Sequence, residues 1–148
     1  MRDELMLRKT IKLLALLVVF CTLFSITASA EMPESKSSKY IFSYDGGCSW
    51  NGSSTVKVRF DITAKRYVDQ LGASQILLYE STDLSTWTLV KTFTYSSYSN
   101  MMAYNTIAMG SNVSYSNAVS GRHYKATITF IVIEGSDSET RTFYTPYI

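Results

Sequence analysis

The feature that most constrains the fold of this chain is a strict alternation of apolar and polar residues along residues 55–64. Val56, Val58, Phe60 and Ile62 alternate there with threonine and charged side chains. Successive side chains of a β-strand point to opposite faces, so the pattern predicts a strand with one buried and one solvent-facing side. Residues 122–134 show the same alternation, with these residues on the expected buried face: Tyr124, Ala126, Ile128, Phe130 and Val132.

Five further segments are expected to form shorter strands. They are residues 40–44, 75–80, 87–95, 112–116 and 140–145. Turn-forming residues lie between them: Asp45-Gly46-Gly47 is expected to end the first, and residues 81–86 to join two strands as a hairpin. Residues 64–71 have the spacing of one or two helical turns, and residues 96–110 fit a strand with a long loop.

About seven short strands separated by turns predict an all-β fold. We expect an antiparallel β-sandwich with immunoglobulin-like architecture over residues 40–148. A small open barrel is the alternative. A parallel α/β fold is disfavoured because it needs helices between the strands, and the sequence has few helical signals.

Residues 1–30 have the order of a secretory signal peptide. A basic start is followed by the apolar run 13–24 and by the small-residue site Ala28-Ser29-Ala30, which predicts cleavage between Ala30 and Glu31. The run is shorter than the ~20 residues of a membrane-spanning helix, although an uncleaved anchor is the alternative interpretation. Residues 31–39 are polar and are expected to be a flexible lead.

Cleavage would leave a secreted, formally neutral chain, because the leader supplies the net charge of +2 of the full sequence. A neutral chain without a basic cluster disfavours nucleic acid as a partner. The sequence has no second long apolar run after residue 30, so we expect no membrane contact after cleavage. Cys48 would be the one remaining cysteine, so we expect packing rather than an internal disulfide to stabilise the domain. Sparse cysteines favour a bacterial exported protein.

The segment from Ser120 to Phe130, in which a glycine-containing turn precedes Tyr124 at the opening of an alternating strand, resembles the penultimate strand of fibronectin type III and immunoglobulin-like domains. The resemblance implies that the Tyr124 ring packs inside while its hydroxyl bonds nearby backbone. Residues 52–56, 78–87 and 121–130 together resemble a group of small exported immunoglobulin-like proteins of Firmicutes, clostridia especially, that have no assigned function. That resemblance implies no catalytic or binding residues.

Catalytic and metal-binding chemistry has little support in the sequence. His123 is the only histidine, and a zinc site needs several His or Cys ligands. A Cys48–His123 dyad is conceivable, but Cys48 lies in a turn-like stretch without a nucleophile motif. Phosphate-binding and dinucleotide motifs do not occur either. We therefore expect a protein that is not an enzyme and that has no cofactor or metal.

The segment from Ser81 to Trp87 resembles the Asp-box turn of sialidase-like propellers, but it lacks the glycine of that motif and is one residue short. The chain is also too short for a propeller. We expect a hairpin loop capped by Asp83, with Trp87 packed below it.

Aromatic residues are the one feature of the sequence that points to a binding role. All 11 tyrosines and both tryptophans follow residue 30. Tyr95, Tyr98 and Tyr104 flank a polar, methionine-containing stretch and form the candidate recognition surface, since rings with a polar tip suit sugar or protein surfaces. Tyrosine is also a common strand residue, which explains these positions without a ligand.

These observations predict a secreted, non-enzymatic β-sandwich that binds at the cell surface or outside the cell. The partner classes that we expect are a cell-wall polysaccharide or a surface protein. Two alternatives stay open, a stand-alone carbohydrate-binding module and a small secreted toxin resembling a bacteriocin. We expect a single domain without an attached catalytic domain, which weakens the first alternative. The sequence is also poor in His and Cys, which weakens an enzymatic toxin.

Overall fold

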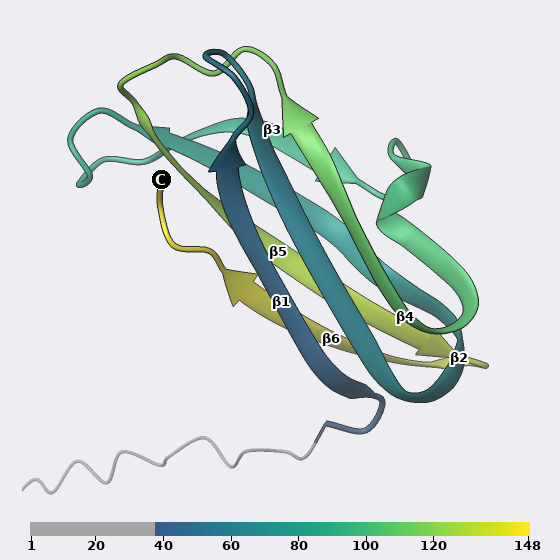
Figure 1. Cartoon of the computed structure of the whole chain (residues 1–148). Coiled ribbons are helices and arrows are strands. Elements are labelled where there is room, and N and C mark those ends of the chain that lie inside the picture. Colours follow the sequence, from purple (N-terminus) through teal and green to yellow (C-terminus); the bar gives the residue numbers. More distant parts are fainter. Residues whose placement is uncertain (1–37) are drawn as a thin grey trace, which may run out of the picture. The chain divides into compact units, whose positions relative to one another are not determined.

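Figure 1 shows a computed structural model of the chain, which describes residues 38–148. These residues form six antiparallel strands joined by hydrogen bonds into one sheet, together with one short 3-10 turn. The prediction of an all-β, antiparallel fold is confirmed. The predicted signal peptide, its cleavage site and residues 31–37 of the lead lie outside the described residues. The elements are β1 Ile41–Trp50, β2 Val56–Ser81, β3 Thr88–Thr94, η1 Ser99–Met101, β4 Met102–Tyr115, β5 His123–Glu134 and β6 Asp137–Tyr144.

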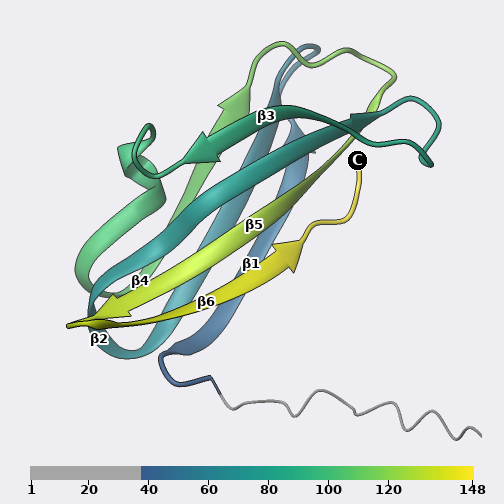
Figure 2. The same cartoon turned by 180° about the vertical axis from the view of Figure 1, so that it is seen from behind.

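Strand β2 is 26 residues long and organises the whole fold. Its first part, residues 56–64, pairs with β1 on one side and with β4 on the other. Its second part, residues 70–81, pairs with β5, and β3 lies on the opposite side of that part. Strand β6 then extends the pairing beyond β5. In Figure 1 β1, β4 and the first part of β2 face the viewer, whereas β3, β5 and β6 face the viewer in Figure 2.

The hydrophobic core is formed by buried side chains of this sheet, most of them from β2 and β5. The alternating residues of β2 and β5 that were predicted to be buried are all buried. The Tyr44 ring of β1 lies 5.4 Å from that of Phe130 on β5 and 6.3 Å from that of Phe143 on β6. Side chains from β1 therefore contact side chains from β5 and β6 across the core, although these pairs of strands share no ladder.

The predicted helical turns at residues 64–71 are wrong, because β2 runs through this segment without interruption. Val68 and Leu71 are both buried, and their spacing of three mimics a helix. The register with β4 shifts between Thr63 and Val68. Such an irregularity inserts extra residues into one strand and changes which residues face inward. The helical spacing is thus produced by the bend of a long strand.

The predicted end of the first strand at Asp45-Gly46-Gly47 is also wrong, because β1 continues to Trp50. Gly46 is buried, and a Cβ atom there would overlap the Ile128 side chain of β5. The glycine is required by the close approach of β1 to β5 rather than by a turn. Cys48 consequently lies within a strand and not in a turn-like stretch.

The least readable part of the sequence, residues 96–110, contains the turn η1 and most of strand β4. Strand β4 is therefore much longer than the predicted segment 112–116. Only Met102 and Val113 of its 14 residues are buried, so most of the strand lacks the alternation that identifies a half-buried strand. Strand β6 likewise begins at Asp137, three residues before the expected start.

The first described residues are bound to β6 through a carboxylate. Glu139 accepts hydrogen bonds from the Ser38 hydroxyl at 3.1 Å and from the backbone N–H groups of Tyr40 and Ile41 at 2.7 and 3.1 Å. Lys39 forms an ion pair with Asp137. Burial alone would raise the pKa of the Glu139 carboxyl, but these hydrogen bonds outweigh it and hold the pKa below its usual value.

Candidate functional site

The outward face of strands β2, β5 and β6 carries a groove of about 320 Å³ whose lining includes three aromatic side chains. The register explains its composition, because Tyr79 of β2 is opposite Lys125 of β5 and Thr127 of β5 is opposite Tyr144 of β6. Alternation places all four side chains on the face away from the core. We call this site the aromatic groove; its lining is Tyr79, Trp87, Lys125, Ala126, Thr127, Tyr144 and Thr145.

Trp87 reaches the groove from the loop between β2 and β3, which is organised by Asp83. The Asp83 carboxylate accepts hydrogen bonds from the backbone N–H groups of Ser85 and Thr86 at 2.9 and 2.8 Å. These bonds hold the pKa of Asp83 well below its usual value. The Trp87 indole N–H donates to the Leu84 carbonyl at 3.2 Å. The predicted Asp83-capped loop is confirmed, and its effect is to fix the position of the indole ring.

Two side chains, Lys125 of the groove and Tyr147 beside it, contact the Trp87 ring. The Lys125 ammonium lies 4.0 Å from the centre of the indole ring, a cation–π contact. The centre of the Tyr147 ring lies 6.4 Å from the centre of the Trp87 ring. Tyr144 and Tyr147 are 74% and 57% exposed, so both rings present free surface to solvent. Such a surface offers flat apolar faces and polar tips to a ligand.

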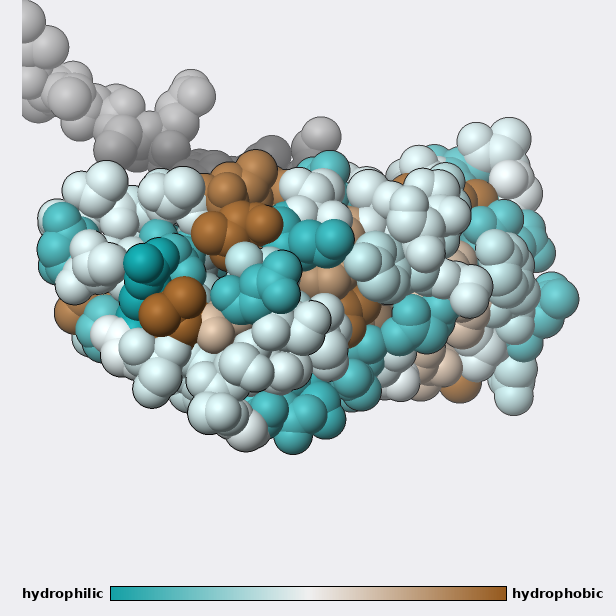
Figure 3. Space-filling model, turned by 90° about the horizontal axis from the view of Figure 1, so that it is seen from above, coloured by the Kyte–Doolittle hydropathy of each residue, from teal (hydrophilic) through white to brown (hydrophobic). Residues whose placement is uncertain are grey.

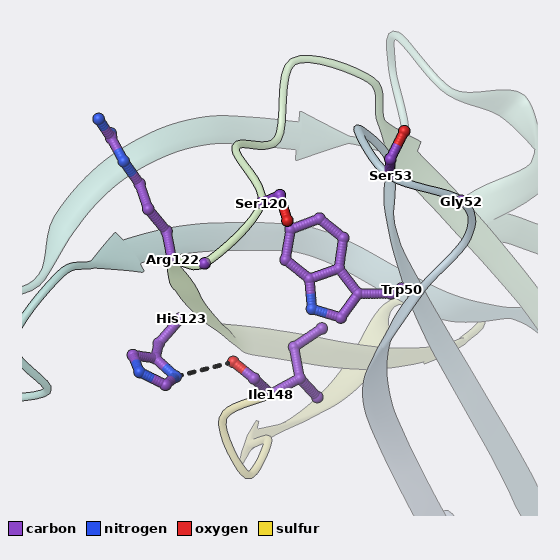
Figure 4. Close-up of a pocket in the computed structure, with 8 residues that line it drawn as sticks. Trp50, Gly52, Ser53, Ser120, Arg122, His123 and Ile148 are labelled. Atoms are coloured by element: carbon purple, nitrogen blue, oxygen red, sulfur yellow. Dashed lines mark hydrogen bonds between the residues drawn. The ribbon is translucent and has the colours of Figure 1, made fainter.

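A second cavity, of about 360 Å³, lies at the end of the strands beside Trp50, and Figure 4 shows it. Two of its polar side chains, those of Arg122 and His123, already have partners within the protein. The His123 Nδ1 atom lies 3.3 Å from the main-chain oxygen of Ile148, the contact dashed in Figure 4. Arg122 forms an ion pair with Glu80. The Trp50 ring packs edge-on against the buried Tyr124 at 5.4 Å. These contacts assign the Trp50, Arg122 and His123 side chains of this second cavity to packing within the protein.

The view from above, onto the end of the molecule where the β1–β2 and β4–β5 connections lie, shows a mostly hydrophilic surface with small separate hydrophobic patches (Figure 3). A broad apolar surface for protein docking is normally contiguous. This end therefore offers no large apolar face in that view.

The structure does not bring Cys48 and His123 together. The Cys48 sulfur contacts the Thr145 hydroxyl at 3.4 Å, whereas the His123 ring contacts Ile148 and lies 5.7 Å from the Tyr147 ring. Burial raises the pKa of the Cys48 thiol, which disfavours the thiolate that a nucleophile needs. Within residues 38–148 no group of three or more His, Cys, Asp or Glu side chains is placed to hold a metal ion.

The three tyrosines of the candidate recognition surface occupy different surroundings. Tyr98 is half-buried, and its ring packs against that of Phe93 at 5.1 Å. Tyr95 and Tyr104 are exposed, the former just after β3 and the latter on β4 opposite Gln70. None of the three lines either cavity described above. Their role in recognition stays a prediction.

Sequence reasoning missed the aromatic groove as a site, although it had placed Trp87 in a capped loop. Alternation along residues 122–134 does put Lys125 and Thr127 on the solvent side. The pairing of these residues with Tyr79 and Tyr144 depends on strand order and register, which a single sequence does not reveal.

A scan against protein-family models and searches of curated proteins and of solved structures found no match to this chain. Among residues 38–148, no helix has the length and apolar character needed to cross a bilayer.

Proposed function

We propose that this chain is an exported, non-enzymatic, immunoglobulin-like β-sandwich that binds carbohydrate outside the cell through the aromatic groove. The single observation that carries the proposal is a groove that places the rings of Tyr79, Trp87 and the largely exposed Tyr144 together with Lys125. Sugar rings have apolar C–H faces and polar edges. Aromatic faces beside hydroxyl and ammonium groups complement both features.

The division of strands supports a sandwich of the immunoglobulin type. If β2 is counted as two strands where it bends, β1, the first part of β2 and β4 form one group, and β3, the second part of β2, β5 and β6 form the other. The predicted core runs between the groups. In this arrangement the groove lies on the outer face of the larger group, where a ligand needs no conformational change to reach it.

The dimensions of the groove support a sugar more than a macromolecular partner. Small-ligand sites typically have volumes of about 300–1,000 Å³, and the groove reaches the lower end of that range. A protein partner would need a contact of roughly 800 Å² on each side. The short signal-like leader and its small-residue site support export, which would bring the groove to polysaccharides at the cell surface.

Adsorption of the purified protein to insoluble cell-wall polysaccharide tests the proposed function. We expect Tyr144→Ala to reduce adsorption about tenfold, because losing one stacked aromatic ring removes ~1–1.5 kcal/mol. Tyr67→Ala is the matched control: Tyr67 is 71% exposed but lies at the bend of β2, near the opposite end of β5. The proposal would be refuted if Tyr144→Ala adsorbed as well as Tyr67→Ala, or if neither the wild type nor the variants adsorbed at all.

Export is tested separately. The small-residue site predicts that secreted material begins at Glu31. N-terminal sequencing of the protein from culture medium measures this directly, and a membrane-retained chain that still begins at Met1 would contradict it.

A further inference from the structure

Lys125 is the charged residue that gives the aromatic groove its electrostatic character. Its ammonium lies over the Trp87 ring, and among residues 38–148 no carboxylate lies within salt-bridge distance of it. The other residues that line the groove carry no formal charge. A positive charge in this groove is therefore not balanced by its lining.

The nearest acidic residue along β2 does not neutralise the groove. Glu80 follows Tyr79, but its side chain points to the core side, where it accepts a hydrogen bond from the Tyr124 hydroxyl and pairs with Arg122. Only 12% of the Glu80 side chain is exposed. Strand alternation thus keeps this carboxylate on the opposite face from Lys125.

The Trp87 ring also restricts where Lys125 can direct its charge. A lysine side chain normally samples many rotamers, but the cation–π contact at 4.0 Å holds this ammonium within the groove. Its three N–H donors cannot all be satisfied by an aromatic face. An anionic oxygen arriving in the groove would accept from them and form a charge-assisted hydrogen bond.

From these observations we infer that the groove binds an anionic carbohydrate, with the charged group of one sugar unit at the Lys125 ammonium and neighbouring sugar rings against the exposed tyrosines. This inference rests on the proposed carbohydrate-binding function and adds the charge of the ligand. Carboxylates of uronic acids and phosphate groups share the required chemistry, and the experiment separates the two.

The experiment compares chains that differ only in charge. Titration calorimetry would use oligogalacturonate and its methyl ester as one pair, and phosphorylated pentamannose and its dephosphorylated form as the other. We expect one of the two acidic chains to bind at least about tenfold more tightly than its neutral form, the effect of one charge-assisted hydrogen bond. The pair that shows the preference identifies the anion.

Variants assign the preference to Lys125. We expect Lys125→Gln to bind the acidic and neutral forms equally, and Lys125→Arg to restore at least part of the preference. Lys91→Gln is the control, because Lys91 also lies over an aromatic ring, that of Phe93, but outside the groove. Thermal unfolding of each variant verifies that it is folded.

The outcomes distinguish this inference from the proposed function. Equal binding of charged and neutral chains, with loss of both in Tyr144→Ala, would overturn the anion preference and keep carbohydrate binding. A preference that survives in folded Lys125→Gln would also overturn the inference. No binding of any of the four chains, together with no adsorption to wall polysaccharide, would refute both.

Discussion

Glu80 and Tyr124 are opposite each other on β2 and β5, and the Tyr124 hydroxyl donates a hydrogen bond of 2.5 Å to the Glu80 carboxylate. The same hydroxyl accepts a hydrogen bond of 2.8 Å from the backbone N–H of Val119, five residues upstream. The ring is fully buried. The expectation drawn from fibronectin-like strands, a buried ring with its hydroxyl on nearby backbone, is therefore confirmed. Burial and the Glu80 carboxylate raise the pKa of Tyr124 to about 12.

Removing only this hydroxyl should destabilise the domain. Tyr124→Phe leaves the Val119 N–H without its acceptor and the Glu80 carboxylate with Arg122 alone, and we expect the free energy of unfolding to fall by about 1–3 kcal/mol. Tyr124→Ala also leaves a cavity, so its loss should reach about 3–5 kcal/mol by analogy with Phe→Ala. Urea denaturation measures both. Tyr104→Phe, at a 61% exposed residue, is the control, and wild-type stability of Tyr124→Phe would disprove the role of the hydroxyl.

Adjacent glycines in β1 should respond differently to the same substitution. Gly46→Val places methyl groups against Ile128 in the core, and overpacking of this kind costs about 1–3 kcal/mol. Gly47→Val meets no atom within 4 Å of the new Cβ, so its effect should stay within about 0.5 kcal/mol. Thermal unfolding compares the two variants. Equal stability of Gly46→Val and Gly47→Val would contradict the close packing of Gly46 of β1 against Ile128 of β5.

Acid should weaken the attachment of residues 38–41 to β6. The folded pKa of Glu139 is lowered, so the unfolded chain takes up a proton more readily than the folded one. The stability that Glu139 contributes is fully present above an ordinary carboxyl pKa of about 4.3 and is lost as pH falls through the lower, folded pKa.

The variant Glu139→Gln isolates this effect from the other carboxylates. It should be less stable than wild type at pH 7 by about 1–3 kcal/mol, and the difference should shrink as pH falls below about 4. Urea denaturation at several pH values measures the difference. A gap between the two proteins that does not change with pH would show that the hydrogen bonds of Glu139 do not depend on its charge.

Two tyrosines of the predicted recognition surface should separate by their effect on stability. Tyr98 packs on Phe93, so Tyr98→Ala should lower the free energy of unfolding by about 1–3 kcal/mol. Tyr104 is exposed, and Tyr104→Ala should change it by no more than about 0.5 kcal/mol. Adsorption of Tyr104→Ala to wall polysaccharide then tests recognition without a stability effect. Equal stabilities would contradict the packing role assigned to Tyr98.

The strands that the sequence predicts correctly are those with one buried and one solvent-facing side. Alternation identified the buried faces of residues 56–62 and 124–132, because burial on one side forces a period of two. Alternation was lost at residues 64–71, where a bend in β2 produces a helical spacing. The turn-forming character of Asp45-Gly46-Gly47 misplaced the end of β1, because Gly46 packs against β5 within a strand. Glycine in contact with a distant strand and glycine in a turn look the same in one sequence.

The candidate site could be predicted only in part for a related reason. Asp83 and Trp87 belong to a local turn whose hydrogen bonds span three residues or fewer, so the sequence contains the information. Lys125 and Tyr144 reach the groove through pairings between strands far apart in the chain. Tyr95, Tyr98 and Tyr104 are close in sequence, whereas the rings of the groove are close only in the fold.

The most direct test of the central claim uses the two tryptophans of the chain as probes of the two cavities. Trp87 lines the aromatic groove and Trp50 lines the second cavity, so each indole N–H signal in a ¹⁵N–¹H NMR spectrum reports on one site. Trp50→Phe assigns the two signals. On titration with an anionic oligosaccharide, carbohydrate binding in the groove predicts a saturable shift of the Trp87 signal while the Trp50 signal stays in place. A shift of Trp50 alone, or no shift of either signal, would contradict the account.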